Sequence, residues 1–157
     1  MSLPNPAALD ARFLAAITTG FKTSRAAAAL PQTAAEALFT ISGGQVLLLG
    51  IVGEVTTIIQ TQANNTKLTA NPTTGTSVDI CAVLSITADE VGCLYGITGL
   101  FSDALVGANA GAAPWPHRPV VLPVGTLDLD CAASNTGEIK WDCYWLPLSD
   151  GAVVAAA

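Results

Sequence analysis

The chain has 157 residues, of which 51% are hydrophobic and 11% charged, and its formal net charge is −6. A charged share of about 25% is usual, so much of the surface must consist of small or uncharged polar residues, whose burial against a partner costs little. Six basic residues against twelve acidic ones argue against direct binding of nucleic acid, because phosphate contacts need clustered Lys and Arg. The composition favours one domain that packs against other proteins.

Residues 1–35 are rich in Ala with scattered Pro, and we expect them to form an N-terminal arm ahead of a single β domain over 36–157. The spacing of Thr33 and Glu36 matches a helix capping box, which predicts a short helix in this arm. Proline and charged residues interrupt the pattern of a secretory signal, so we expect a cytosolic product.

Half of the basic residues, Arg12, Lys22 and Arg25, lie in the first 25 positions. Two interpretations stay open: a solvated tail, or an arm that touches an acidic neighbour. In the second interpretation Phe13 and Phe21 are apolar anchors, and the arm becomes ordered when it docks. These five residues are candidate partner contacts.

From about residue 37 onward the chain shows short β-prone segments separated by Gly, Pro and Asn turns, which is typical of a sandwich or barrel. We therefore predict an all-β fold, a β-sandwich or jelly-roll-like barrel of about eight or nine short antiparallel strands. The predicted strands are 37–42, 45–52, 54–62, 66–70, 76–86, 93–99, 119–123, 125–132 and 137–146.

The stretch 43–65 is the most conspicuous one in the chain. Val46–Val52 is a continuous apolar run of seven residues, far below the roughly 20 residues that span a bilayer, so no membrane segment is expected. The pattern predicts two strands of a structural core, joined or bent near Gly53, with Gly50 and Gly53 marking a bulge or a close backbone approach. Glu54 is expected to mark the place where the chain meets water or a partner.

Alternation within two later segments predicts which side chains face inward. In 126–131 the acidic side chains of Asp128 and Asp130 are expected on a solvated face, opposite the apolar ones. In 139–145 the two Trp residues share the face of Ile139, which favours core packing over sugar binding. The four cysteines Cys81, Cys93, Cys131 and Cys143 show no C-x-x-C spacing, and free buried thiols are expected.

The segment 102–119 is rich in Gly, Ala and Pro and is predicted to be a long loop, where contacts with partners are often made. Trp115, flanked by prolines, is a candidate exposed anchor, and Pro116, His117 and Arg118 extend this candidate contact. The single histidine excludes any two-His metal site, and an exposed loop is a poor place for a catalytic base. No phosphate-binding or nucleophile motif occurs, so we expect neither an enzyme nor a cofactor.

Two segments, "ALFTISGGQVLLLGIVGEVTTIIQTQANNTKLTANPTTGTSVDICAVLSITADEVG" and "GTLDLDCAASNTGEIKWDCYWLPLSDGA", carry a resemblance over roughly residues 36–151. In their Thr/Gly/Ala-rich strands and few charges they resemble small β-rich virion proteins of tailed bacteriophages, and most of all the capsid decoration (cement) proteins. The resemblance implies a protein made in the host cytoplasm and placed on the capsid surface of the virion. It implies a homotrimer that binds the major capsid protein between capsomers and stabilises the head.

Two alternatives remain. Within virion proteins, a tail or head-to-tail joining component would form rings larger than a trimer. From another class, a carbohydrate-binding or adhesive β-sandwich would bind sugar through Trp115.

Overall fold

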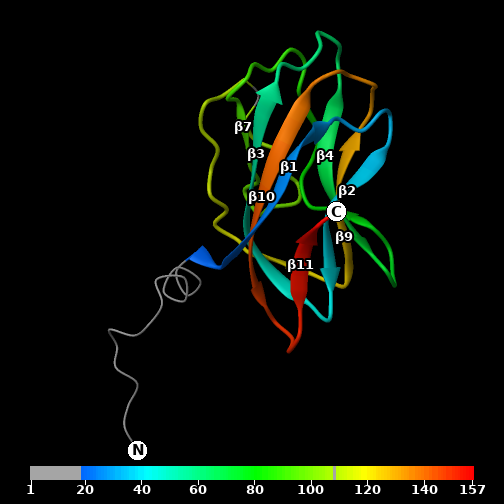
Figure 1. The fold of residues 1–157 in the computed structure, drawn as a ribbon, viewed down its shortest axis with the longest axis vertical. Helices are drawn as coiled ribbons and strands as arrows, with labels where there is room; N and C mark the ends of the chain where they lie inside the picture. The colour runs from blue at the N-terminus through cyan, green and yellow to red at the C-terminus, as the bar shows by residue number, and fades with distance from the viewer. Residues whose placement is uncertain (1–18, 108) are drawn as a thin grey trace, which may run out of the picture.

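The computed structural model describes residues 19–107 and 109–157, which form two antiparallel sheets packed face to face (Figure 1). The first sheet has the order β1 (Phe21–Ala29), β10 (Glu138–Pro147), β3 (Val46–Thr57) and β7 (Leu94–Tyr95), and β8 (Val120–Leu122) also pairs with β3. The second has the order β11 (Val153–Ala156), β2 (Ala35–Ser42), β9 (Gly125–Cys131), β4 (Asn65–Pro72) and β5 (Val78–Asp79), and β6 (Leu84–Ser85) also pairs with β4. The prediction of an all-β sandwich is confirmed.

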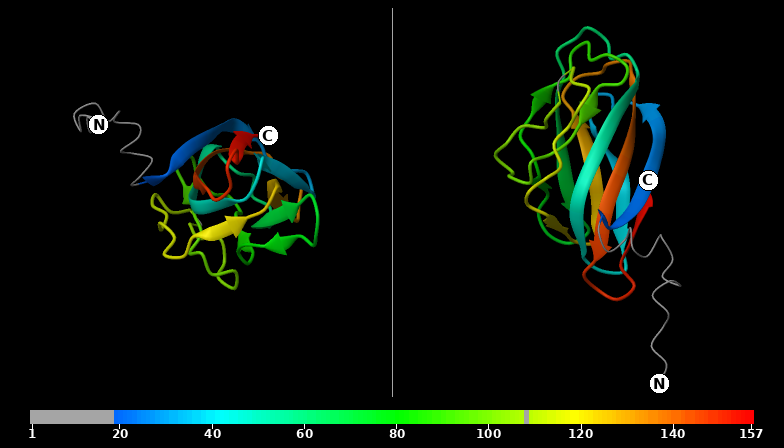
Figure 2. Two further views of the ribbon diagram at one scale, coloured as in Figure 1. Left: turned by 90° about the horizontal axis from the view of Figure 1, so that it is seen from below. Right: turned by 90° about the vertical axis from the view of Figure 1, so that its left-hand side faces the viewer.

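The two sheets curve around one core, which is visible when the molecule is seen from below (Figure 2). Long strands supply most of that core, and the loop between β7 and β8 runs along one side (Figure 2). The predicted loop at 102–119 is confirmed, because the described residues between these two strands form only the isolated bridges Ala82↔Ala104 and Gly96↔Val106. The predicted strand 76–86 is two short strands, β5 and β6.

The stretch that was expected to form two strands is one continuous strand, β3. Its glycines do not turn the chain, since each accommodates an aromatic ring from another segment. A Cβ atom on Gly53 would lie 2.7 Å from the ring of Trp141, and one on Gly50 would lie 2.8 Å from the ring of Trp115. The expected close approach is therefore confirmed and the bend is wrong. Glu54 is half-buried and forms an ion pair with Lys140 at 2.8 Å.

The predicted inward faces of β9 and β10 are confirmed, but one residue predicted to face solvent, Asp128, is buried as well. Ile139, Trp141, Cys143 and Trp145 are all buried. Asp128, expected on a solvated face, is also buried, and its Oδ2 accepts a hydrogen bond from Asn71 Nδ2 at 3.2 Å. It lies on the central strand β9, opposite Ala37 of β2 and Thr69 of β4, whereas burial of Asp130 is only partial.

The boundary of the N-terminal arm needs correction. Residues 21–29, assigned to the arm, form β1, which pairs with β10 from Phe21↔Trp145 to Ala29↔Glu138. The Ala-rich sequence has little strand propensity of its own, so pairing with the strongly β-prone β10 decides the conformation. Lys22 and Arg25 therefore belong to a sheet and not to a solvated tail.

The capping-box prediction is also wrong, because Thr33 has a positive φ of 54° and Glu36 lies in β2. Residues 35–42 form a strand and not a helix because the strand buries the side chains of Leu38, Phe39 and Ile41 in the core. At the other end of the chain, β11 was not predicted. It pairs with β2 through Val153↔Ser42 to Ala156↔Phe39.

A chain of hydrogen bonds ties the two sheets together beside β11. Trp145 Nε1 donates to Thr23 Oγ1 at 3.0 Å, and Thr23 Oγ1 donates to the carbonyl of Val154 at 3.0 Å. One threonine on β1 thus connects the first sheet to the edge of the second.

Gly53→Ala is expected to lower the free energy of unfolding by about 1–3 kcal/mol, because the added methyl group overpacks the site against the Trp141 ring. Gly111→Ala is the matched control, since nothing lies within 4 Å of a Cβ there, and a change within about 0.5 kcal/mol is expected. Urea unfolding measures both. Equal stabilities for the two variants would contradict the contact.

Candidate interaction surface

The structure brings some of the predicted contact residues together around Tyr144, on the outer face of the first sheet. Lys22 Nζ lies 5.9 Å from the centre of the Tyr144 ring and 3.0 Å from Asp142 Oδ2. The Trp115 ring meets Tyr144 edge-on, with 5.0 Å between centroids. The hydrogen bond to Asp142 raises the pKa of Lys22, which keeps its ammonium group charged. Lys22 and Trp115, far apart in sequence, therefore share one surface.

The loop that carries Trp115 presents most of the predicted contact. Trp115 is 46% exposed, and His117 and Arg118 are exposed as well. Pro116 is buried, so its side chain is not part of that surface and its inclusion was wrong. The loop is held close to Gly99, where φ is +89° and a Cβ would lie 2.2 Å from the carbonyl oxygen of Arg118.

The remaining predicted contacts are placed differently. Arg12 and Phe13 lie outside the described residues. Phe21 is half-exposed, and its ring centroid lies 5.4 Å from that of Trp145. Arg25 is half-buried and shares the inner face of β1 with Phe21 and Thr23.

An apolar groove of about 160 Å³ lies where the ends of the two sheets meet. Val78 on β5, Phe101 on the long loop and Val121 on β8 are 47%, 47% and 53% exposed around it. The lining is apolar except for one threonine: Ala70, Pro72, Thr76, Val78, Ile80, Phe101, Val120, Val121, Leu122 and Pro123. Half-exposed apolar side chains gathered around one groove mark a contact site more than isolated ones do.

Sequence reasoning missed this groove, because its parts come from three separate short segments. Val121 was placed in a predicted strand, but nothing in the sequence indicates that this strand lies at the edge of a sheet beside Phe101. The Val78 segment was predicted as part of a longer strand. Only the pairing of β5 with β4 and of β8 with β3 brings the segments together.

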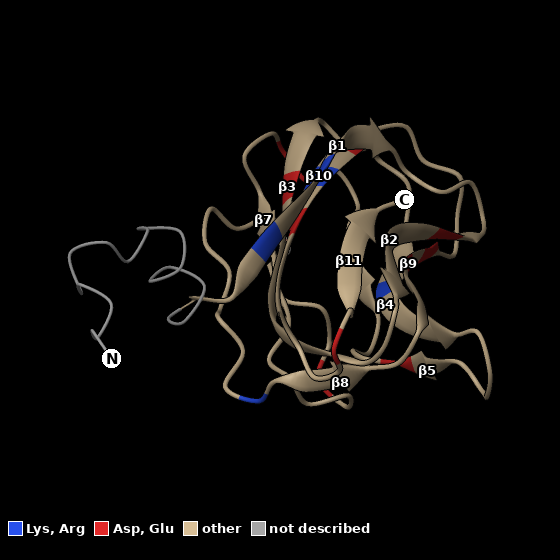
Figure 3. Ribbon diagram, turned by 60° about the horizontal axis from the view of Figure 1, so that its bottom comes forward, with Lys and Arg blue, Asp and Glu red and all other residues tan. Residues whose placement is uncertain are grey.

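Charged residues on the strands are sparse (Figure 3), and an ion pair with a carboxylate is formed by each of the three lysines, Lys22, Lys67 and Lys140. Lys67 Nζ lies 2.8 Å from Asp79 Oδ2 and 3.6 Å from Asp130 Oδ2. The hydrogen bond between Lys67 and Asp79 raises the pKa of the lysine and lowers that of the carboxyl group. The outer faces thus carry paired charges among uncharged side chains, a surface that loses little solvation when a partner covers it.

A buried polar pair joins β7 to the turn that precedes it. The Tyr95 hydroxyl donates a hydrogen bond to Asp89 Oδ2, and both residues are at most 2% exposed. Burial, followed by the hydrogen bond to Asp89, raises the pKa of Tyr95, so the hydroxyl keeps its proton. The sequence shows Asp89 only as a turn residue beside Glu90, and its burial was not predicted.

All four cysteines are buried free thiols, as expected. Burial is the main cause that raises the pKa of each thiol, and it raises the pKa of Cys143 to about 12. Reactive cysteines have lowered pKa values, because the thiolate is the nucleophile. These side chains therefore belong to the core.

Comparison with protein-family models gives no match, and comparisons with curated proteins and with solved structures give none either. Within residues 19–107 and 109–157, no group of three or more His, Cys, Asp or Glu side chains is placed to hold a metal ion. In the same part of the chain, no helix has the length and hydrophobicity that crossing a membrane requires.

The raised pKa of Cys143 predicts a loss of stability at alkaline pH. The unfolded thiol ionises near pH 8.5 and the folded one near 12, so between these values the unfolded state binds fewer protons and the free energy of unfolding falls as pH rises. Relative to Cys143→Ala, the parent protein should lose up to about 1.4 kcal/mol per pH unit above pH 8.5. Urea unfolding under reducing conditions from pH 8 to 10 measures the difference, and parallel curves would contradict it.

Proposed function

We propose that this chain is a non-enzymatic structural protein of a phage virion, a decoration protein that binds the outer capsid surface between capsomers and stabilises the head. The observation that carries the proposal is the apolar groove bounded by Val78, Phe101 and Val121 on a rigid sandwich of low charge. A cement protein must spread contacts over several subunits, and a surface that is easily desolvated is suited to that task.

The proposal assigns separate contacts to two surfaces, the apolar groove and the loop around Trp115. The groove is the more apolar one, and permanent interfaces between identical subunits are the more hydrophobic class, so we assign the groove to contacts between copies in a trimer. The loop around Trp115 carries an aromatic ring beside the exposed His117 and Arg118. Aromatic and Arg side chains are enriched at the centres of interfaces, so we assign this loop to the major capsid protein.

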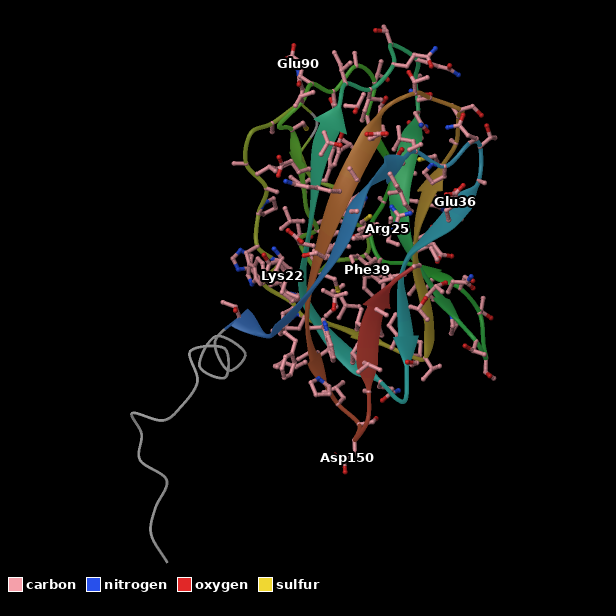
Figure 4. All side chains as sticks on the ribbon, in the orientation of Figure 1. Lys22, Arg25, Glu36, Phe39, Glu90 and Asp150 are labelled. Carbon is pink, nitrogen blue, oxygen red and sulfur yellow. The ribbon has the colours of Figure 1, made fainter. Side chains whose placement is uncertain are left out.

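The assignment of the groove predicts the effect of a charge placed in it. Val121→Glu should convert the trimer of about 48 kDa, three times 15.9 kDa, into a monomer, because burying an unpaired carboxylate opposes association. Val91→Glu is the control, since Val91 is 64% exposed and does not line the groove; its neighbour Glu90 lies at the top of the view in Figure 4. Sedimentation velocity gives the masses. A parent chain that is monomeric, or a trimer that survives Val121→Glu, would contradict the assignment.

Residues 1–18 stay in the proposal as a capsid-binding segment, on the strength of Arg12 and Phe13 in the sequence. Because β1 belongs to the first sheet, the deletion that tests this segment must end at residue 18 and not at 35. The shortened chain should keep its β-sheet circular dichroism and bind heads of the phage that carries the gene at least tenfold more weakly. Unchanged binding in co-sedimentation would remove the segment from the proposal.

The two alternatives, a joining component and a carbohydrate-binding module, remain predictions, and measurements on the same purified protein distinguish them. A joining component would sediment as a ring larger than a trimer. A carbohydrate-binding module would bind glycans and lose that binding in Trp115→Ala.

A further inference from the structure

Arg25 and Trp141 lie directly opposite each other in the pairing of β1 with β10, so their side chains leave the sheet on the same face. Trp141 is 1% exposed, which shows that this face is the inner one. Lys22 lies on the other side of β1, whereas Arg25 lies between β1 and β2, on the side of Phe39 (Figure 4). The arginine therefore enters the seam between the two sheets.

The orientation of the Trp141 indole is set by Gly53 on β3. A Cβ on Gly53 would meet the six-membered ring at Cη2, Cζ3 and Cε3. In an indole, Nε1 is on the side opposite these three carbons, so it is turned away from Gly53. Trp141 Nε1 is buried and has no acceptor within hydrogen-bonding distance, and the same is true of Arg25 Nε among the described residues.

Trp145, four residues further along β10, provides an internal comparison. Its Nε1 donates to Thr23 Oγ1 at 3.0 Å, so here β1 supplies an acceptor to the indole. Opposite Trp141, β1 supplies Arg25, whose guanidinium group can only donate. Two buried N–H donors on facing residues therefore lack an acceptor among the described residues, and leaving buried donors unpaired destabilises a fold.

A small cavity of about 10 Å³ is lined by Arg25, Trp141 and Glu36, and its other lining residues are apolar. A volume of this size holds roughly one water molecule or one monatomic ion. Arg25 has no acidic side chain within 4 Å among the described residues, and Glu36, which is exposed, forms no ion pair with it. Arg25, a cation without an ion-pair partner, and Trp141, with an unpaired indole N–H, therefore line the same cavity.

We propose that this seam is a binding site for a halide-sized monovalent anion, held by Arg25 Nε–H and Trp141 Nε1–H. Charge-assisted hydrogen bonds are the stronger kind, and the low dielectric of the interior strengthens them further. A bound anion would connect the two donors inside the seam, above the link that Thr23 makes to Val154. A water molecule is the competing occupant, and it would accept from the two N–H groups and donate a hydrogen bond to the Glu36 carboxylate.

The experiment compares thermal unfolding of the full chain in sodium chloride and in sodium gluconate at equal ionic strength, since gluconate is too large for the cavity. Chloride should raise Tm by several degrees in a saturable manner, and gluconate should not. Arg25→Met and Trp141→Phe should abolish the difference, because each removes one donor and keeps most of the apolar volume. Thr23→Val is the control, and it should lower Tm while leaving the chloride response intact.

Glu36→Gln distinguishes the two occupants. Removing this negative charge should strengthen chloride binding, so that half-saturation occurs at a lower chloride concentration. Equal Tm values in chloride and gluconate for the parent chain would overturn the proposal in favour of water. A chloride response that persists in Arg25→Met would also overturn it.

A bromide derivative gives a readout that does not depend on variants that fold. Crystals grown in sodium bromide should show an anomalous peak within hydrogen-bonding distance of Trp141 Nε1. Absence of that peak would overturn the proposal.

Discussion

The contact between the Trp141 indole and the backbone of Gly53 is the one on which the centre of the molecule depends. Gly53 stands in register with Trp141 on one side and with Tyr95 on the other, and Arg25 stands opposite Trp141. One row of four residues therefore crosses the first sheet from β1 to β7. Because the glycine has no side chain, Trp141 can lean over β3, with its ring centroid 6.3 Å from that of Tyr95.

This row has consequences at both of its ends. At the β7 end, the Tyr95 hydroxyl donates a hydrogen bond to Asp89, which ties the turn before β7 to this strand. At the β1 end, Arg25 Nε and Trp141 Nε1 are buried donors without an acceptor among the described residues. The same row of residues therefore reaches from the turn before β7 to the seam at the opposite side of the sheet. Partner binding and internal anion binding are expected to be separable, because Trp115 and the groove lie outside this row.

The fold class and the inner faces of the strands could be predicted from the sequence, because alternation of side chains is a local property. The 139–145 segment illustrates this, since the burial of Trp141 and Trp145 follows from their spacing alone. The conformation of β1 could not be predicted in this way, because its Ala-rich sequence becomes a strand only through pairing with a segment more than a hundred residues away. The sequence correctly predicted a close approach at Gly50 and Gly53. It could not predict which rings fill the space, because Trp115 and Trp141 come from distant segments.

In the candidate site, too, local features could be predicted from the sequence and features that depend on distant segments could not. Exposure of Trp115 was predicted from its loop and is confirmed. The groove depends on which short strands lie at the sheet ends, and the donor pair in the seam depends on the register of β1 with β10. Register is set by the whole sheet, so neither feature has a signal in the sequence.

The proposal that the chain decorates a phage head can be tested by cryo-electron microscopy of virions. Density of the size and shape of this sandwich is expected in groups of three on the outer capsid surface between capsomers, and it should be lost from heads made without the gene. Density for the sandwich in the tail or at the head-to-tail junction, or particles unchanged by loss of the gene, would contradict the account.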